Sequence, residues 1–196
     1  MPEYNSMNHA IILAAGQGKR LGGSRDKMLI SAGGHPLIYY SLMAFNDHPD
    51  IDSITVVCHK NNKSKIEEVA KLYRFSKVKQ VLIGGSTRQQ SLAKGLESLA
   101  KIAKKDDIIL VHNGANPLPG SEEISQTIEI SRQQGACIVG HFISATIKEI
   151  NDKHVIKTHD RDKLFAAETP QAVQYNLLKK ALENAKQELQ GKIEEL

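Results

Sequence analysis

Short apolar runs recur along the chain, with helix-length segments between them. Runs rich in valine and isoleucine that lack polar alternation, as in strands covered on both faces, occupy residues 9–15, 53–59, 78–84, 107–113 and 136–142. Helical spacing is found in the segments between them, at 36–47, 63–74, 86–105 and 121–135. Strands that alternate with helices predict right-handed crossovers and a mainly parallel sheet in a three-layer α/β fold.

Two of the predicted helices carry more detailed signals. In the third, one apolar stripe is formed by Leu92, Leu96, Leu99 and Ala103. In the fourth, Ser121 is the expected N-cap, and acidic residues fill the first turn.

The alternation stops after Phe142. Residues 146–150 and 154–158 read as two short strands around a turn at Asn151–Asp152. This hairpin predicts a β-arm over about 145–162 that protrudes from the sheet, and such arms commonly reach a neighbouring subunit. A last helix is expected from Gln174 onward, with an apolar stripe at Leu178, Leu182, Ala185 and Leu189.

Composition narrows the class of protein. We expect one domain over the 196 residues, with no membrane span and no signal peptide. The net charge of +4 suits a phosphate-bearing ligand, whereas five tyrosines, four phenylalanines and no tryptophan argue against nucleic-acid binding. Cys58 and Cys137 lie in strand-like runs and are interpreted as buried thiols, so a cytoplasmic location is expected.

A small, glycine-rich and basic segment follows the first predicted strand. Such a turn after a parallel strand places backbone N–H groups at the ligand-binding edge of an α/β sheet. The residues that allow close approach are Ala14, Ala15, Gly16 and Gly18, and the cations are Lys19, Arg20, Arg25 and Lys27. The spacing matches neither a Walker loop nor a Rossmann fingerprint. The residues alone therefore leave a polyphosphate-binding loop and a plain surface turn both open.

Four segments together resemble a known family. "AAGQGKRLGGSRDK" resembles the AAGxGxR…K loop of nucleotidyltransferases that make activated sugars and alcohols, which have a GT-A-like Rossmannoid fold. "GGSTRQQS" (84–91) resembles GGxxRxxS, "VHNGANP" (111–117) resembles VHDAARP, and "THDRDKLFAAETPQAV" (158–173) resembles a segment ending in TPQxF. In this order they indicate the 2-C-methyl-D-erythritol 4-phosphate cytidylyltransferase family over roughly residues 9–180. The related ribitol-5-phosphate cytidylyltransferases share most of these motifs.

The resemblance implies a reaction between CTP and an alcohol phosphate that gives a CDP-alcohol and pyrophosphate, with Mg²⁺ on the triphosphate. Arg20 and Lys27 would stabilise charge on the reacting phosphorus, while a solvated role is expected for Arg25. The implied nucleotide-binding residues are Ala14, Ala15, Gly16, Gly18, Gly84, Gly85, Arg88 and Ser91, and those for the second substrate are Thr146, Arg161 and Thr169. Two plainer interpretations stay open: Lys27 as a surface cation, and Ser86 as an N-cap with Arg88 merely exposed.

The resemblance also implies a homodimer, because the arginine of the arm, here Arg161, acts across a dimer interface in the family. His112 matches a histidine with a structural role. The other histidines lack metal-ligand spacing and are interpreted as core or solvated side chains: His9, His35, His48, His59, His141, His154 and His159.

The chain departs from the family at three motif positions. Asn113 replaces an aspartate that helps to position the metal and the ribose, which makes it at best a weak Mg²⁺ ligand. Asn116 replaces an arginine associated with the second substrate, and Ala145 replaces an aspartate that addresses substrate hydroxyls. The family also continues through a segment with a second catalytic lysine, for which Lys192 is no substitute, so we expect a C-terminus truncated relative to the family.

Three hypotheses follow from these departures. The first is a cytidylyltransferase for methylerythritol phosphate with a shortened C-terminus. The second is the same chemistry on another alcohol phosphate, such as ribitol phosphate. The third is a weakly active or inactive homologue that serves as a nucleotide-binding or dimerisation module.

Overall fold

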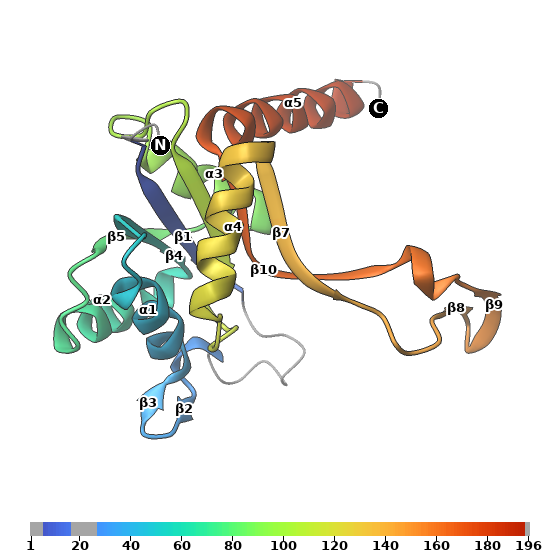
Figure 1. The fold of residues 1–196 in the computed structure, drawn as a ribbon, viewed down its shortest axis with the longest axis horizontal. Coiled ribbons are helices and arrows are strands. Elements are labelled where there is room, and N and C mark those ends of the chain that lie inside the picture. Colours follow the sequence, from blue (N-terminus) through green and yellow to red (C-terminus); the bar gives the residue numbers. More distant parts are fainter. Residues whose placement is uncertain (1–5, 17–26, 195–196) are drawn as a thin grey trace.

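A six-stranded sheet with the order β5-β4-β1-β6-β10-β7 organises the chain (Figure 1). The computed structural model describes residues 6–16 and 27–194. Pairing is parallel between β1 and both β4 and β6, and between β4 and β5, whereas β10 runs antiparallel to β6 and β7. The strands are β1 (Asn8–Ala14), β4 (Ser53–Cys58), β5 (Val78–Ile83), β6 (Ile108–Asn113), β7 (Ala136–Phe142) and β10 (Phe165–Gln174). The predicted mainly parallel α/β sheet is confirmed.

Helices cover both faces of this sheet. One apolar cluster joins the sheet to α1 (Leu37–Asp47), α2 (Lys63–Leu72) and α4 (Ser121–Gln134). A second cluster, on the opposite face, joins it to α3 (Arg88–Ser98) and α5 (Tyr175–Glu194). The three-layer arrangement is therefore confirmed.

The central strand shows why the apolar runs lack alternation. Every residue of β1 is buried. Ala10 and Ile12 belong to the first cluster, and Ile11 and Leu13 belong to the second. Successive side chains of a strand point to opposite faces, so a strand between two helical layers needs apolar residues at every position.

Strand β10 was not predicted. Its segment "FAAETPQAVQ" contains Glu168, Thr169 and Pro170, where its register with β7 shifts between Ala167 and Gln171. Because β10 enters between β6 and β7 from the opposite direction, a pattern of parallel strands and helices gives no sign of it.

Helix boundaries differ from the sequence-based expectations at two places. The prediction of Ser121 as N-cap is wrong: Gly120 is the cap, and its N–H donates to the Glu123 carboxylate at 3.0 Å. The third helix is shorter than the predicted 86–105 and ends at Ser98, although Leu96 and Leu99 of its stripe are buried as expected.

The predicted arm is present. It consists of β8 (Lys148–Asn151) and β9 (His154–Thr158), whose residues are all exposed, and it projects from the body of the molecule (Figure 1). Its turn lies one residue later than predicted, with Asp152 and Lys153 in the left-handed region at φ 43° and 69°.

Smaller elements complete the chain. A two-stranded hairpin pairs β2 (Ser31–Ala32) with β3 (His35–Pro36). The described residues also form the short 3-10 helices η2 (Lys27–Leu29), η3 (Lys60–Asn62) and η4 (Arg161–Lys163). Within the residues described, no helix has the length and apolar character that crossing a membrane requires. Cys58 is buried as expected, but Cys137 is only half-buried because β7 is an outer strand.

Candidate functional site

The carboxyl ends of β1, β4, β5 and β6 meet at one edge of the sheet because these strands are parallel. The chain leaves this edge after β1 through Ala15 and Gly16. Gly16 is exposed, and among the described residues other than its chain neighbours no atom lies within 4 Å of the Cβ position built on it. The other predicted loop residues, Gly18, Lys19, Arg20 and Arg25, lie outside the described residues.

The turn after β5 packs directly on this exit from β1. A Cβ atom on Gly84 would lie 2.8 Å from the Cβ of Ala15 and 2.7 Å from the Oγ of Ser91, which no real side chain tolerates. The Gly84 N–H also donates to the carbonyl oxygen of Cys58 at 2.8 Å. The structure therefore brings two segments predicted to bind nucleotide, Ala14–Gly16 and Gly84–Gly85, into contact.

Ser91 holds this turn from beneath. Its hydroxyl accepts from the Gly85 N–H at 3.1 Å and donates to the Thr87 carbonyl at 2.9 Å, and the residue is buried. Thr87, rather than Ser86, caps α3 by accepting from the Gln90 N–H at 3.1 Å. Ser91 thus shapes the turn.

A second residue that supports the turn had not been predicted. The Lys94 ammonium donates to the carbonyl oxygen of Gly84 at 3.0 Å and lies 3.4 Å from that of Ile83. Its position one turn after Ser91 on α3 is the only signal that the sequence offers for this contact.

Lys27 is brought to the same edge by its neighbour. Met28 is buried, and its Sδ lies 3.3 Å from the Cβ position of Gly114, which follows β6. Gly114 in turn donates its N–H to the carbonyl oxygen of Leu13 in β1 at 2.9 Å. Lys27 itself is half-buried, and its role at this edge stays a prediction.

Arg88, at the start of α3, contacts Asn113 at the end of β6. Its Nη1 donates to the Oδ1 of Asn113. Partial burial lowers the pKa of Arg88, but an arginine stays protonated at neutral pH. Arg88 is therefore fixed by a specific partner, although the rest of its side chain is exposed.

The loop after β6 is tied to β10 and α1. Asn116 donates from Nδ2 to the Thr169 carbonyl at 3.3 Å, and the Asn113 N–H donates to Thr169 Oγ1 at 3.4 Å. Ser41 donates to the Asn116 carbonyl at 3.0 Å. Thr169 is buried, so this predicted second-substrate residue mainly supports the loop in a single chain.

His112 lies beneath the same loop. Its Nε2 donates to the Asn116 carbonyl at 2.8 Å, its ring packs against Phe45, and its buried Nδ1 has no partner. Burial is the main cause that lowers the pKa of His112 to about 4, and the charge of Arg88 acts in the same direction. His112 is therefore neutral at physiological pH and has a structural role, as expected.

Two predicted second-substrate residues lie apart from this edge. Thr146 and Arg161 flank the strands of the arm and are exposed, and Arg161 donates to the Ser144 carbonyl at 2.7 Å. The arm projects away from the body (Figure 1), so one chain does not bring β8 and β9 together with the carboxyl end of β1.

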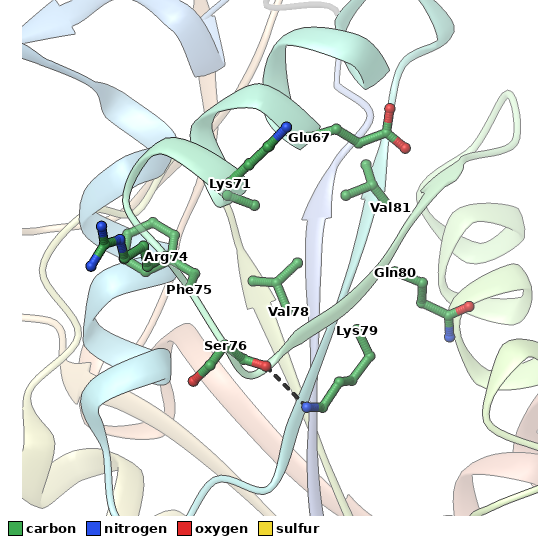
Figure 2. A pocket seen from close by; sticks show the side chains of 10 residues that line it. Glu67, Lys71, Arg74, Phe75, Ser76, Val78, Lys79, Gln80 and Val81 are labelled. Atoms are coloured by element: carbon green, nitrogen blue, oxygen red, sulfur yellow. Dashed lines mark hydrogen bonds between the residues drawn. The ribbon is translucent and has the colours of Figure 1, made fainter.

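A hollow of about 500 Å³ lies elsewhere, at the amino end of β5. Figure 2 shows Lys71 and Arg74 on the α2 side and Ser76, Val78 and Lys79 on the strand side. The Lys79 ammonium donates back to the Ser76 carbonyl at 3.0 Å. It is a wide groove at the opposite end of β5 from the Gly84 turn, so we do not assign the functional site to it.

Comparison with known proteins identifies the family. A family model described as IspD, 2-C-methyl-D-erythritol 4-phosphate cytidylyltransferase, matches residues 8–195. The chain belongs to this family. The enzyme of that name from Clostridium tetani is 37% identical over 174 residues, which are 88% of this chain and 69% of the relative. The one from Lachnoclostridium phytofermentans is 39% identical over 176 residues, or 89% and 74% of the two chains.

Solved structures agree with this assignment. The 4-diphosphocytidyl-2C-methyl-D-erythritol synthase of Anaerococcus prevotii matches with a TM-score of 0.75 and 27% identity, over 92% of this chain and 75% of that one. The 2-C-methyl-D-erythritol 4-phosphate cytidylyltransferase of Francisella tularensis matches with a TM-score of 0.78 and 27% identity, over 95% and 82%. The fold expected from the motifs is thus the fold of the cytidylyltransferase family.

A protein-held magnesium ion does not fit the described residues. Asn113, predicted to be a weak ligand, already uses its Oδ1 to accept from the Arg88 cation. Among residues 6–16 and 27–194, no group of three His, Cys, Asp or Glu side chains could hold a metal. The described side chains at the carboxyl edge of the parallel strands suit an anion better than a cation.

Proposed function

We propose that this protein transfers CMP from CTP to 2-C-methyl-D-erythritol 4-phosphate and releases pyrophosphate, in the non-mevalonate route to isoprenoid precursors. Membership of the family supports the reaction class and the substrates. The single structural observation that supports it best is the packing of Gly84 on Ala15, which places small residues and backbone side by side at the carboxyl edge of the sheet. Such an edge accommodates a nucleotide against backbone donors and acceptors.

The chemistry asks little covalent work of the protein. A phosphate oxygen of the second substrate attacks the α-phosphorus of CTP, a new P–O bond forms, and the bond from the α-phosphorus to the bridging oxygen breaks. The electron pair leaves with pyrophosphate. Catalysis then depends on alignment and on positive charge near the phosphorus. We assign this charge to Lys27 and to Arg20. Of the two, Lys27 belongs to the described residues, at the start of η2.

We further propose that the protein acts as a homodimer through its arm. Arg161 and Thr146 lie on the projecting arm, so a partner's arm is needed to complete the second-substrate site. The arm and its base expose large apolar side chains, with Phe142 76% exposed and Ile150, Val155 and Ile156 each more than half exposed. Deletion of residues 145–162 should give a monomer in analytical ultracentrifugation, and a dimer that persists without the arm would contradict this proposal.

Mg²⁺ belongs to the same proposal. We expect Mg²⁺ to enter on the phosphate oxygens of CTP rather than to be held by the described side chains.

We also propose a cytoplasmic location. Cys58 and Cys137 are on β4 and β7, four strands apart in the sheet, too far to form a disulfide with each other, which suits a reducing compartment.

The test is the release of pyrophosphate from CTP in the presence of 2-C-methyl-D-erythritol 4-phosphate, with ribitol 5-phosphate assayed beside it. We expect turnover with the methylerythritol phosphate and little with ribitol phosphate. No pyrophosphate with either alcohol, in a protein that still binds CTP, would overturn the proposed transfer and favour a nucleotide-binding module.

One observation keeps another alcohol phosphate as a second candidate. The Asn116 side chain, at the position of the family's arginine, is uncharged and donates to the Thr169 carbonyl, so it offers no cation to a substrate phosphate. A preference for ribitol 5-phosphate in the same assay would select this candidate.

A further inference from the structure

Arg88 is paired with an amide where a carboxylate would have neutralised it. Its Nη1 donates to the Oδ1 of Asn113, and an amide oxygen carries no net charge. Arg88 takes part in none of the ion pairs formed within residues 6–16 and 27–194. The contact with Asn113 therefore leaves the positive charge of the guanidinium uncancelled.

The electrostatic surroundings of Arg88 agree with this. A carboxylate close to Arg88 would raise its pKa, whereas partial burial lowers it. The same positive charge contributes to lowering the pKa of His112, which precedes Asn113 in β6. The positive charge of Arg88 is thus felt at the end of β6.

The contact between Arg88 and Asn113 spans the centre of the site. Arg88 follows the turn after β5, and Asn113 ends β6, while β4 and β1 lie between these strands. Asn113 is in register with Leu13, two residues before Ala15. The guanidinium consequently lies beside the point where the chain leaves β1 for its glycine-rich loop.

Asn113 is itself held in place. Its N–H donates to the Oγ1 of Thr169 at 3.4 Å, and His112 before it is fully buried. A fixed acceptor restricts where the long Arg88 side chain can place its guanidinium. The contact uses one N–H, and a guanidinium has five in all, so donors remain for a ligand.

We propose that Asn113 is a positioning residue that aims the Arg88 guanidinium, with its charge intact, at the phosphates of the bound nucleotide. This rests on the proposed function, because it takes the nucleotide to lie at the carboxyl edge of β1. Arg88 then reads the phosphates rather than the base. An aspartate at position 113 would keep the contact but cancel the charge.

Nucleotide binding without divalent metal tests this proposal. Isothermal titration calorimetry compares CTP with cytidine for the natural protein and for Asn113→Asp, with the chelator EDTA present. We expect Asn113→Asp to weaken CTP binding roughly ten- to hundredfold and to leave cytidine binding unchanged, because bonds to charged groups are the strong ones. Arg88→Met should show the same selective loss.

Asn176→Asp is the matched control. Asn176 is exposed in the first turn of α5, and its N–H bonds to Lys105 before β6, at the other end of the sheet. The Asn176→Asp substitution adds the same negative charge without contacting Arg88, so CTP binding should not change. Equal loss for CTP and cytidine in Asn113→Asp, or no loss for either, would overturn the proposal. A natural protein that binds CTP neither in EDTA nor after Mg²⁺ is restored would instead overturn the proposed function.

Discussion

Gly84 and Ala15 lie so close that a Cβ atom added to Gly84 would stand 2.8 Å from the Cβ of Ala15. These residues end different strands, and their contact closes one side of the candidate site. Gly84→Ala should lower the free energy of unfolding by about 1–3 kcal/mol and weaken CTP binding, because two rigid backbone segments must separate. Urea unfolding and calorimetry with CTP measure the two effects.

Gly16→Ala is the control for stability. No described residue beyond its chain neighbours lies within 4 Å of its Cβ position, so the free energy of unfolding should stay within about 0.5 kcal/mol of the natural value. Equal stability of the two variants would show that the turn after β5 does not press on β1.

Lys27 should act on turnover more than on binding. If its ammonium stabilises charge that develops on the α-phosphorus, Lys27→Ala should lower kcat by about two to three orders of magnitude and change the affinity for CTP much less. Steady-state kinetics and calorimetry separate the two quantities.

Lys71→Ala is the control for Lys27→Ala. It removes an exposed lysine at the hollow of Figure 2, at the other end of β5, and should change neither kcat nor the affinity for CTP. An equal loss of turnover and affinity in Lys27→Ala would mean that the lysine binds only the ground state.

Part of this arrangement could be predicted from the sequence. The strands, the faces of the helices and the arm followed from apolar spacing, because each buried face needs apolar residues at a fixed period. Strand β10 could not be found in this way, because Thr169 and Pro170 interrupt its pattern and its antiparallel entry leaves no local signal.

The candidate site, too, could be predicted only in part. Lys27 and Arg88 stand out by residue type and motif. The contact of Arg88 with Asn113 depends on the order of β5, β4, β1 and β6, which spacing along one chain does not specify. The hydrogen bond from Gly85 to Ser91 likewise could not be predicted, since a motif match does not specify which backbone group a side chain contacts.

His112 should make the protein less stable in mild acid. Its folded pKa of about 4 lies below the unfolded value near 6.5, so the unfolded chain takes up a proton first as the pH falls. Between pH 7 and pH 5 this should cost about 2 kcal/mol. His112→Gln keeps a donor for the Asn116 carbonyl without titrating in this range, and it should lose correspondingly less stability. Parallel slopes for the two proteins in urea unfolding against pH would contradict this assignment.

Asp107 should anchor the amino ends of β1 and β6. Its fully buried carboxylate accepts from the N–H groups of Met7 and Lys104, both at 2.8 Å, and lies 3.3 Å from the Nε2 of His9. Asp107→Asn leaves one backbone donor unsatisfied and should cost about 1–3 kcal/mol in urea unfolding. The neighbouring exposed Asp106→Asn should cost less than about 0.5 kcal/mol, and an equal cost would argue against the anchor.

The most direct test of the central claim is to follow the backbone amide signals of the ¹⁵N-labelled protein by NMR while CTP and Mg²⁺ are added. If the carboxyl edge of β1 binds the nucleotide, the largest shifts should appear at Ala15, Gly16, Gly84 and Gly85, with Lys71 and Lys79 unchanged. Shifts that centre on Lys71 and Lys79, or no shifts at saturating CTP, would contradict it.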